Sequence, residues 1–407
     1  MTTSADPRRP SRPEDPAAPK ARPPLLTRAL MLRFVSMIGA STSFFLLLSV
    51  VPLYARESGG GGNAAGLTTG ALMLSTVLGE LAAPRLVARF GYRLVLSAGL
   101  LLLGAPALAL TASGGLPWIA AVCLVRGLGF ALTIVAGGAL TASLIPDERR
   151  GEGLALVGVV SGVPSLVALP LGVWLVDQVG YGPVAVSGGV VALIAIASVP
   201  GLPDRELMSG RSVGVLAGLR TAALARPAGV FAATALAAGI LVTFLPIAVP
   251  DRFAELAAVA LFLQPAASTV ARWAAGRHGD RHGSARLVLP GLLLSAAGML
   301  ITSLTHSAVA IVVGVTLFGA GFGVAQNSTL ALMYSRVPKA GYGTVTALWN
   351  VAYDAGMGIG AVGFGFLADR TGYPWAFALT AGLMLTATLA AWRDRRGEPA
   401  VTGPEAA

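Results

Sequence analysis

Residues 117 to 144 read PWIAAVCLVRGLGFALTIVAGGALTASL, and Arg126 is the one charged residue among them. An apolar helix of about twenty residues crosses the hydrocarbon core of a bilayer, which is about 30 Å thick. A strand of a membrane barrel would instead show about ten residues of alternating polarity. The stretch therefore predicts a helix that spans a membrane.

Eleven further stretches have the same character, so the chain carries twelve apolar runs of spanning length. The runs cover residues 28–54, 66–88, 93–112, 117–144, 151–175, 182–200, 227–249, 255–275, 286–304, 308–336, 343–368 and 374–392. Over the whole chain 55% of the residues are hydrophobic and 12% are charged, whereas soluble proteins average about 25% charged residues. We therefore expect an all-α integral membrane protein with twelve transmembrane helices, and not a soluble enzyme.

The net charge of +10 could indicate nucleic-acid binding, so the positions of the basic residues must decide. Of the 29 Lys and Arg residues, 25 fall in the two tails and in every second loop between the runs. The other loops carry only Arg56, Arg252 and Arg370. Loops rich in Lys and Arg stay on the cytoplasmic side of a membrane. The pattern predicts a multi-pass protein of the inner (plasma) membrane with both termini in the cytoplasm, and it explains the charge without nucleic acid.

An internal repeat emerges at an offset of 192 residues, which is the distance from Gly91 to Gly283. The matches include loop residues, which two unrelated apolar segments would not share. The pairs are Arg89 with Arg281, Gly91 with Gly283, Gly99 with Gly291, Gly127 with Gly319, Gly129 with Gly321, Phe130 with Phe322, Pro146 with Pro338, Gly151 with Gly343, Asp177 with Asp369, Gly180 with Gly372 and Tyr181 with Tyr373. The sequence thus predicts two parallel six-helix repeats, an architecture of transporters that work by alternating access.

Polar segments set the expected domain boundaries. We expect a disordered cytoplasmic tail over residues 1–24, because this segment is rich in proline and charge. The first bundle should cover 25–200, a cytoplasmic linker 201–226, the second bundle 227–392 and a cytoplasmic tail 393–407. No stretch matches the phosphate-binding loop GxxxxGK[ST], so we expect no cofactor and coupling, if any, to an ion gradient.

Two loops resemble the signature between the second and third helices of the major facilitator superfamily, Gly-x-x-x-Asp-Arg-x-Gly-Arg-Arg. The second-half loop, GRHGDRHGSAR, places four residues on the motif, and the first-half loop, PRLVARFGYR, keeps three but has Pro84 and Ala88 at the Gly and Asp positions. The matching residues are Gly276, Asp280, Arg281 and Gly283 in the second half, and Arg89, Gly91 and Arg93 in the first half. The resemblance implies that these loops gate the movement of the two bundles.

Other stretches are similar to helices of the same family, so the resemblance covers essentially residues 25–395. RGLGFA, from Arg126, resembles the Arg-x-x-Gln-Gly motif of the fourth helix in its arginine. SGVPSLVALPLGVWL weakly resembles the fifth-helix motif of drug antiporters, and the run from Trp349 is similar to the eleventh helix of efflux-type bacterial members. The resemblance implies a transporter that exports its substrate.

Two ionisable residues lie deep within predicted helices. Arg126 lies about nine residues, or roughly 13 Å, into its run, and Asp354 lies about eleven residues into its run. Ionisable groups at such depth usually face the bundle interior or a water-filled path. Asp354 is therefore the best candidate to carry a coupled proton, and Arg126 is a candidate cation that binds substrate or tunes the proton carrier. The structural alternative for each residue is a permanent pair or hydrogen bond between helices.

Glu80 and Arg272 occupy equivalent places under the repeat, each eleven residues before the loop glycine. We expect both near the cytoplasmic mouth, where gate packing or pairing with a loop is the simpler role, and Glu80 is the next proton-coupling candidate after Asp354. Neutral polar residues at helical depth either bind substrate or hydrogen-bond between helices. These substrate-cavity candidates are Asn350, Tyr353, Gln326, Asn327 and Gln264. The three histidines lack the spacing of a metal site.

The sequence leaves the direction of transport open. One hypothesis is a proton-driven exporter of a small organic or amphipathic compound, and the alternative is an importer or facilitator of a sugar, organic acid or amino acid. A non-transporting membrane receptor is a third reading, although no soluble domain is attached to relay a signal. The expected partners are a small-molecule substrate, the proton and the lipid bilayer, and the expected oligomeric state is a monomer.

Overall fold

The computed structural model of the chain describes residues 24–146, 149–204, 220–338 and 341–396. Most of the predicted tails and most of the predicted linker lie outside these residues, and residues 393–396 of the predicted C-terminal tail form the end of a helix. The described residues form helices joined by short connections, with no strand among them.

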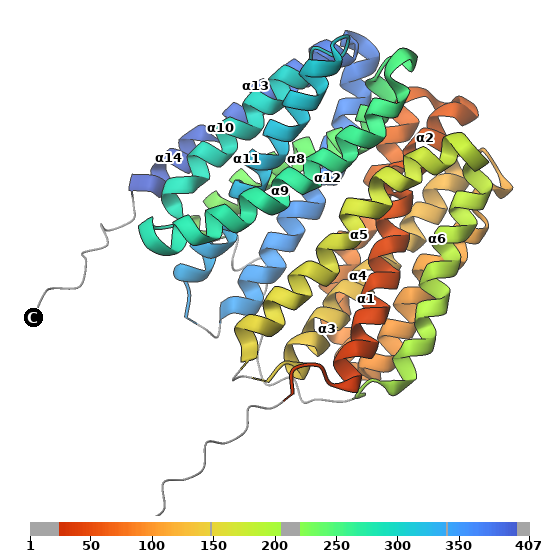
Figure 1. Cartoon of the computed structure of the whole chain (residues 1–407), viewed down its shortest axis with the longest axis vertical. Helices are drawn as coiled ribbons and strands as arrows, with labels where there is room; N and C mark the ends of the chain where they lie inside the picture. Colours follow the sequence, from red (N-terminus) through yellow and green to blue (C-terminus); the bar gives the residue numbers. More distant parts are fainter. Residues whose placement is uncertain (1–23, 147–148, 205–219, 339–340, 397–407) are drawn as a thin grey trace, which may run out of the picture.

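The helices form two bundles that lie side by side (Figure 1). The first bundle consists of α1 (Arg28–Leu48), α2 (Val50–Ala55), the short η1 (Arg56–Gly60), α3 (Gly61–Leu108), η2 (Leu110–Ala112), α4 (Leu116–Leu144), α5 (Arg150–Val179), α6 (Tyr181–Ala195) and η4 (Ile196–Gly201). The second consists of α8 (Ala222–Ala248), η5 (Asp251–Phe253), α9 (Ala254–His282), α10 (Ala285–Thr302), α11 (Ala308–Ser335), α12 (Tyr342–Thr371), α13 (Tyr373–Leu385) and α14 (Thr388–Arg396).

Nine helical segments of the described chain are long and apolar enough to cross a membrane. The first of these, Arg28–Ala112, is 85 residues long and is interrupted at Gly59, Gly61 and Gly91, where φ is positive. It therefore contains more than one of the predicted runs. The all-α membrane fold is confirmed, and the number of twelve crossings stays a prediction.

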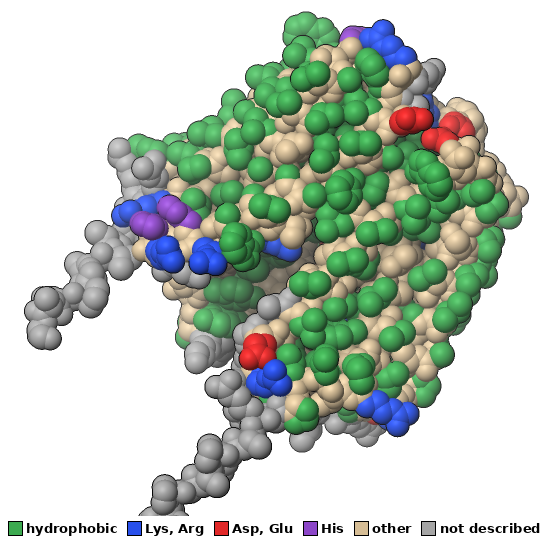
Figure 2. Space-filling view, in the orientation of Figure 1, with side chains coloured by type: hydrophobic (Ala, Val, Ile, Leu, Met, Phe, Trp, Pro, Cys, Tyr) green, Lys and Arg blue, Asp and Glu red, His purple; other side chains and the backbone are tan. Residues whose placement is uncertain are grey.

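The outer surface is apolar in the way that a lipid-facing protein requires. Val309, Trp375 and Ile194 are 73%, 69% and 67% exposed. Figure 2 shows hydrophobic side chains over most of the face in view, with charged side chains gathered near its ends. A soluble monomer rarely exposes apolar patches beyond a few hundred Å², so hydrocarbon is the solvent that this surface fits.

Backbone geometry confirms the internal repeat. Gly91 and Gly283 have φ values of 80° and 88°, and Gly180 and Gly372 have φ values of 81° and 78°. Each pair is separated by 192 residues, and each glycine lies where one helix stops and the next changes direction. Positive φ is accessible to glycine at little cost, which explains why both halves use glycine at these turns.

Helix packing repeats in the same way. A Cβ atom at Gly129 would collide with the backbone nitrogen of Leu103, and one at Gly321 would collide with that of Ser295. Leu103 and Ser295 are again 192 residues apart. The two halves therefore share both their turns and their closest helix contacts.

The bundles meet along two seams that the repeat relates to each other. Helix α3 of the first bundle packs on α12 of the second, and α5 of the first packs on α9 of the second. In the α3/α12 seam the helices approach closely, because Gly66 lies against the backbone of Ala361 and Gly70 lies against Val362. A side chain at Gly66 would separate these helices.

The molecule is closed at the end that carries the Gly60 loop. Apart from a carboxyl pair described below, four side-chain hydrogen bonds join the bundles within the described chain, and all four lie toward that end. They join Ser49 to Val242, Arg56 to Ile247, Asn63 to Asp369 and Thr69 to Thr243. Toward the basic loops, by contrast, the surface is hollowed between the bundles (Figure 2). The structure is therefore open to the side of the basic loops.

Candidate functional site

A cavity of about 190 Å³ lies between the bundles. Both bundles contribute to its walls, through α1 and α5 on one side and α8, α9, α11 and α12 on the other. Its apolar lining includes Phe45, Leu169, Phe322 and Met357. Its polar lining consists of Ser161, Ser165, Gln264, Ser268, Thr269, Arg272, Gln326 and Tyr353. A cavity walled by both halves at their interface is where an alternating-access transporter holds its substrate.

Three of the predicted cavity residues lie in this lining, namely Gln264, Gln326 and Tyr353. Tyr353 stacks with Phe231 at a ring-centroid distance of 5.8 Å and with Trp349 at 6.4 Å, so an aromatic cluster holds its ring. Neither the Gln264 amide nor the Tyr353 hydroxyl has a hydrogen-bond partner among the described side chains and backbone groups. Both groups are therefore available to a ligand.

The other two predicted cavity residues are not part of the lining. A Cβ atom at Gly276 would lie 3.5 Å from the Asn327 amide nitrogen, so Asn327 faces that end of α9. Asn350 is half-buried on α12, three residues before Tyr353. Successive helical residues differ by about 100° in direction, so Asn327 points away from the cavity that its neighbour Gln326 lines.

Arg272 enters the cavity wall from α9. Its Nη1 donates a hydrogen bond to Gln326 Oε1 at 3.3 Å. The ion pairs found within the described chain are Arg149 with Glu152 and Arg336 with Asp394, so no described carboxylate neutralises Arg272. The cavity thus carries one fixed positive charge.

Glu80 and Asp354 form a pair across the α3/α12 seam. Their carboxyl groups lie close enough to interact directly, and the Asp354 residue is only 6% exposed. A hydrogen bond between two carboxyl groups needs a proton, because ionised carboxylates only accept. The two groups can therefore share one proton in this arrangement.

The expectation that Glu80 and Arg272 lie near the cytoplasmic mouth is wrong. Each helix continues unbroken to its loop glycine, eleven residues further on. At the helical rise this places each side chain about 16 Å from the turn. Glu80 thus reaches the depth of Asp354, and Arg272 reaches the central cavity.

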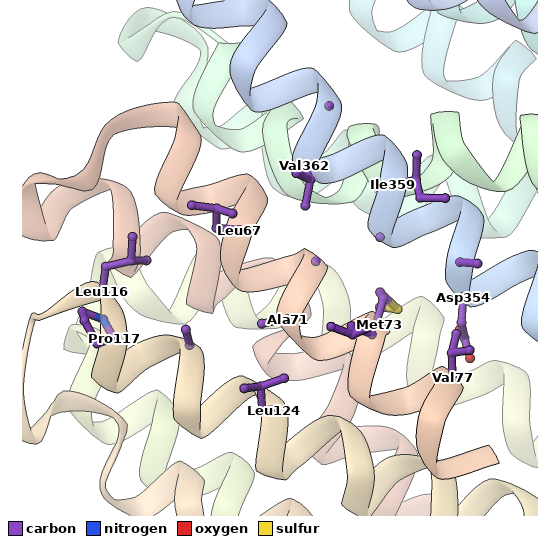
Figure 3. Close-up of a pocket in the computed structure, with 16 residues that line it drawn as sticks. Leu67, Ala71, Met73, Val77, Leu116, Pro117, Leu124, Asp354, Ile359 and Val362 are labelled. Atoms are coloured by element: carbon purple, nitrogen blue, oxygen red, sulfur yellow. The ribbon is translucent and has the colours of Figure 1, made fainter. Parts of the chain in front are cut away.

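A second space flanks the carboxyl pair on the outer side of the seam. It measures about 860 Å³ and is lined by α3, α4 and α12. Leu67, Leu124, Ile359 and Val362 form part of its apolar wall, and Asp354 lies at one end of it (Figure 3). Asp354 is the one ionisable residue in this lining. The carboxyl pair thus separates an apolar groove from the interior of the protein.

Arg126 hydrogen-bonds to backbone groups of the first bundle and not to Asp354. The Arg126 residue is 1% exposed, its Nε donates to the Leu103 carbonyl at 3.2 Å, and its Nη2 donates to the Ser43 carbonyl at 3.0 Å. These bonds tie α4 to α3 and to α1. Hydrogen bonds to charged groups contribute about 1.5–3 kcal/mol each, so backbone carbonyls compensate much of the cost of this buried cation.

The first-half gating loop is held by a residue that the motif does not contain. At the Gly91 turn, the Arg93 backbone N–H donates to Asp204 Oδ1 at 3.2 Å, and the Tyr92 N–H donates to the Asp204 carbonyl at 3.1 Å. The Arg93 side chain also donates to the Leu202 carbonyl. Asp204 therefore supplies the carboxylate that Ala88 lacks. The one sequence signal for it is an acidic residue just after the sixth apolar run.

The second-half gating loop turns at Gly283, whose N–H donates to the Gly279 carbonyl at 2.9 Å. Arg281 is exposed, as is Arg89 in the first-half loop. The side chain of Asp280 lies outside the described part of the chain. The gating role of both loops remains a prediction.

Comparison with known proteins agrees with the fold. The family model described as Major Facilitator Superfamily matches residues 33–361 and 227–407. The chain is 27% identical over 370 residues to a chloramphenicol resistance protein of Streptomyces lividans, covering 88% of this chain and 94% of the relative. It is 22% identical over 362 residues to the staphylopine export protein of Staphylococcus aureus, covering 82% and 88%.

Solved structures of the nucleoside transporter NupG share the fold at 13% sequence identity. Two of them superpose with TM-scores of 0.73 and 0.69, covering 90% and 92% of this chain and 100% of each of theirs. Two repeated bundles, a cavity between them and a family match over most of the sequence lead to one conclusion. The chain belongs to the Major Facilitator Superfamily, and it is a multi-pass membrane transporter and not an enzyme.

Proposed function

We propose that this transporter exports a small organic compound in exchange for protons, and that Glu80 and Asp354 together hold the coupled proton. The observation that carries the proposal is the close pair of buried carboxyl groups at the junction of the two bundles, where α3 packs on α12 and Glu80 Oε2 has no other partner in the described chain. Loss of the shared proton places two negative charges in contact within a poorly hydrated seam. Like charges in such surroundings repel strongly, so deprotonation favours separation of α3 from α12.

Because the packing of α3 on α12 depends on the shared proton, protonation of the carboxyl pair determines the side to which the cavity opens. The protonated pair stabilises the packed α3/α12 seam, which closes the Gly60 end. When the proton leaves toward the basic loops, the seam loosens and the Gly60 end opens. A proton taken up from that side then restores the packed state. A ligand can only shift such an equilibrium through its different affinity for the two states, and the carboxyl pair supplies that difference for the proton.

Direction and orientation follow from two further observations. Placing the 25 basic residues of the tails and alternate loops in the cytoplasm makes the present arrangement open to the cytoplasm. Substrate enters the cavity from that side and leaves at the Gly60 end. The relative named as an export protein supports this direction. The likeness to NupG concerns the fold alone, so it does not favour import.

Arg126 has a supporting role in this proposal. Its bonds to carbonyls of α1 and α3 fix the bundle from which Glu80 projects. The cation thereby stabilises the bundle that carries Glu80, and it needs no direct contact with Asp354.

The test is transport by purified protein in liposomes with an imposed proton gradient, using a panel of small organic compounds. The wild type should concentrate at least one compound, and a protonophore should abolish the accumulation. Asp354→Asn and Glu80→Gln should each remove accumulation while leaving exchange of the compound across the membrane measurable. Asp177→Asn is the matched control, because Asp177 is an exposed acid at the end of α5. If Asp354→Asn still concentrates the compound, the carboxyl pair is structural and the proposal is wrong.

A further inference from the structure

We infer that the transported compound carries an acidic group, such as a carboxylate, which pairs with Arg272 in the central cavity. The inference names a substrate class for the proposed transport function and rests on it. Binding of such a compound depends neither on proton coupling nor on the direction of transport, so it can be tested separately.

Arg272 has more hydrogen-bond donors than the described protein groups around it accept. A guanidinium group has five N–H donors and remains charged at every physiological pH. The structure gives Arg272 one protein acceptor, Gln326 Oε1, and that acceptor is a neutral amide. The remaining donors have no acceptor among the described residues. A bidentate carboxylate is the group that matches a free guanidinium edge.

The neighbours of Arg272 in the cavity lining add further polar groups. The Gln264 amide and the Tyr353 hydroxyl line the same cavity and have no partner within the described chain. Gln326 accepts from Arg272 with its oxygen, which leaves its amide NH₂ to donate. The cavity lining contains no Asp or Glu. It therefore offers several donors and a positive charge, but no negative charge to attract a cationic drug.

The internal repeat matches Arg272 in the second half of the chain with Glu80 in the first. Arg272 and Glu80 are 192 residues apart and occupy equivalent positions in the two halves. The Glu80 carboxyl group already has a protein partner, Asp354. The Arg272 side chain instead lines the cavity, where a ligand can reach it. The two halves thus place opposite charges at equivalent depth, and only the positive one faces the cavity.

The volume of the cavity limits the size of the ligand. The cavity measures about 190 Å³, below the roughly 300–1,000 Å³ of sites for drug-sized ligands. The rings of Phe45 and Phe322 lie in its apolar lining. A small aromatic or branched-chain acid fits this volume and this chemistry better than a large amphipathic drug.

The experiment measures binding to detergent-purified protein with pairs of compounds that differ in one group. Each pair holds an acid and its amide, for example 4-hydroxybenzoate with 4-hydroxybenzamide, and phenylacetate, salicylate and 2-oxoisovalerate are treated likewise. Thermal shifts at graded concentrations give the affinities at one pH. At least one acid should bind about tenfold tighter than its amide, as expected for a charge-assisted bidentate contact.

Variants assign the effect to Arg272. Arg272→Gln should abolish the preference for the acid, and Arg272→Lys should retain part of it. Arg277→Gln is the control, because Arg277 is exposed on the same helix; this variant should bind like the wild type. The inference is overturned if no acid of the panel binds tighter than its amide, or if Arg272→Gln prefers acids as the wild type does. Either result leaves the coupling role of Glu80 and Asp354 to be decided by its own transport test.

Discussion

The α3/α12 seam and the α5/α9 seam are related by the internal repeat, yet their chemistry differs. The first holds Glu80 against Asp354, and its helices approach through Gly66 and Gly70. The second borders the cavity with hydroxyl groups of α5 and α9, and it holds Arg272 at the position equivalent to Glu80. A duplicated backbone thus carries the proposed proton site in one seam and the proposed substrate site beside the other.

The difference also separates rigid packing from open space. Backbone contact at glycines makes the α3/α12 seam tight, so a small change in charge there affects the whole junction. The lining of the α5/α9 seam leaves a cavity, in which side chains contact a ligand instead of another helix. Interiors packed without voids transmit displacement, whereas a cavity absorbs it.

The largest effect is expected from a bulky residue in the tight seam. Gly66→Leu places a side chain against the backbone of Ala361, while a Cβ atom at Gly158 on α5 has no neighbouring atom within 4 Å. Overpacking costs about 1–3 kcal/mol, so Gly66→Leu should reduce transport in liposomes about tenfold or more. Gly158→Leu should stay within about twofold of the wild type. Equal loss in both variants would remove the distinction between the seams.

A smaller effect is expected at the first-half gating loop. Asp204→Asn weakens the hydrogen bond to the Arg93 backbone and should cost about 1 kcal/mol. The melting temperature of the purified protein should fall by about 2 °C, and Asp177→Asn should leave it unchanged. An unchanged melting temperature in Asp204→Asn would show that the contact does not hold the loop.

The sequence predicts the repeat well because loop residues such as Gly91 and Gly283 are constrained by backbone conformation. The all-α fold follows with the same certainty from the apolar runs. Depth along a single helix can also be estimated from the sequence, although the charge of Glu80 by itself suggests a helix end. Eleven residues of unbroken helix before Gly91 already place it near the depth of Asp354.

Contacts between the bundles could not be predicted in the same way. The contact between Glu80 and Asp354 depends on how one bundle is rotated relative to the other. The periodicity of a single helix does not reveal this rotation. The partners of Arg126 are backbone carbonyls, and a carbonyl has no signature in a sequence. The sequence also does not show which helix faces line the cavity, so it does not distinguish Gln264 and Gln326, which line it, from Asn327, which does not.

The central claim, that a shared proton holds the α3/α12 seam closed, is tested most directly by a distance measurement. Spin labels at Ser58 and Arg370, both exposed near the closed end, report its opening by double electron–electron resonance without any substrate. Cys123, which is buried, is first replaced by alanine. Wild-type protein in lipid should show a short distance in acidic buffer and a longer one in alkaline buffer. The double variant Glu80→Gln with Asp354→Asn should show the short distance in both. The account would be contradicted by a wild-type distance that does not change with pH. It would also be contradicted by a double variant whose distance lengthens in alkaline buffer as the wild-type distance does.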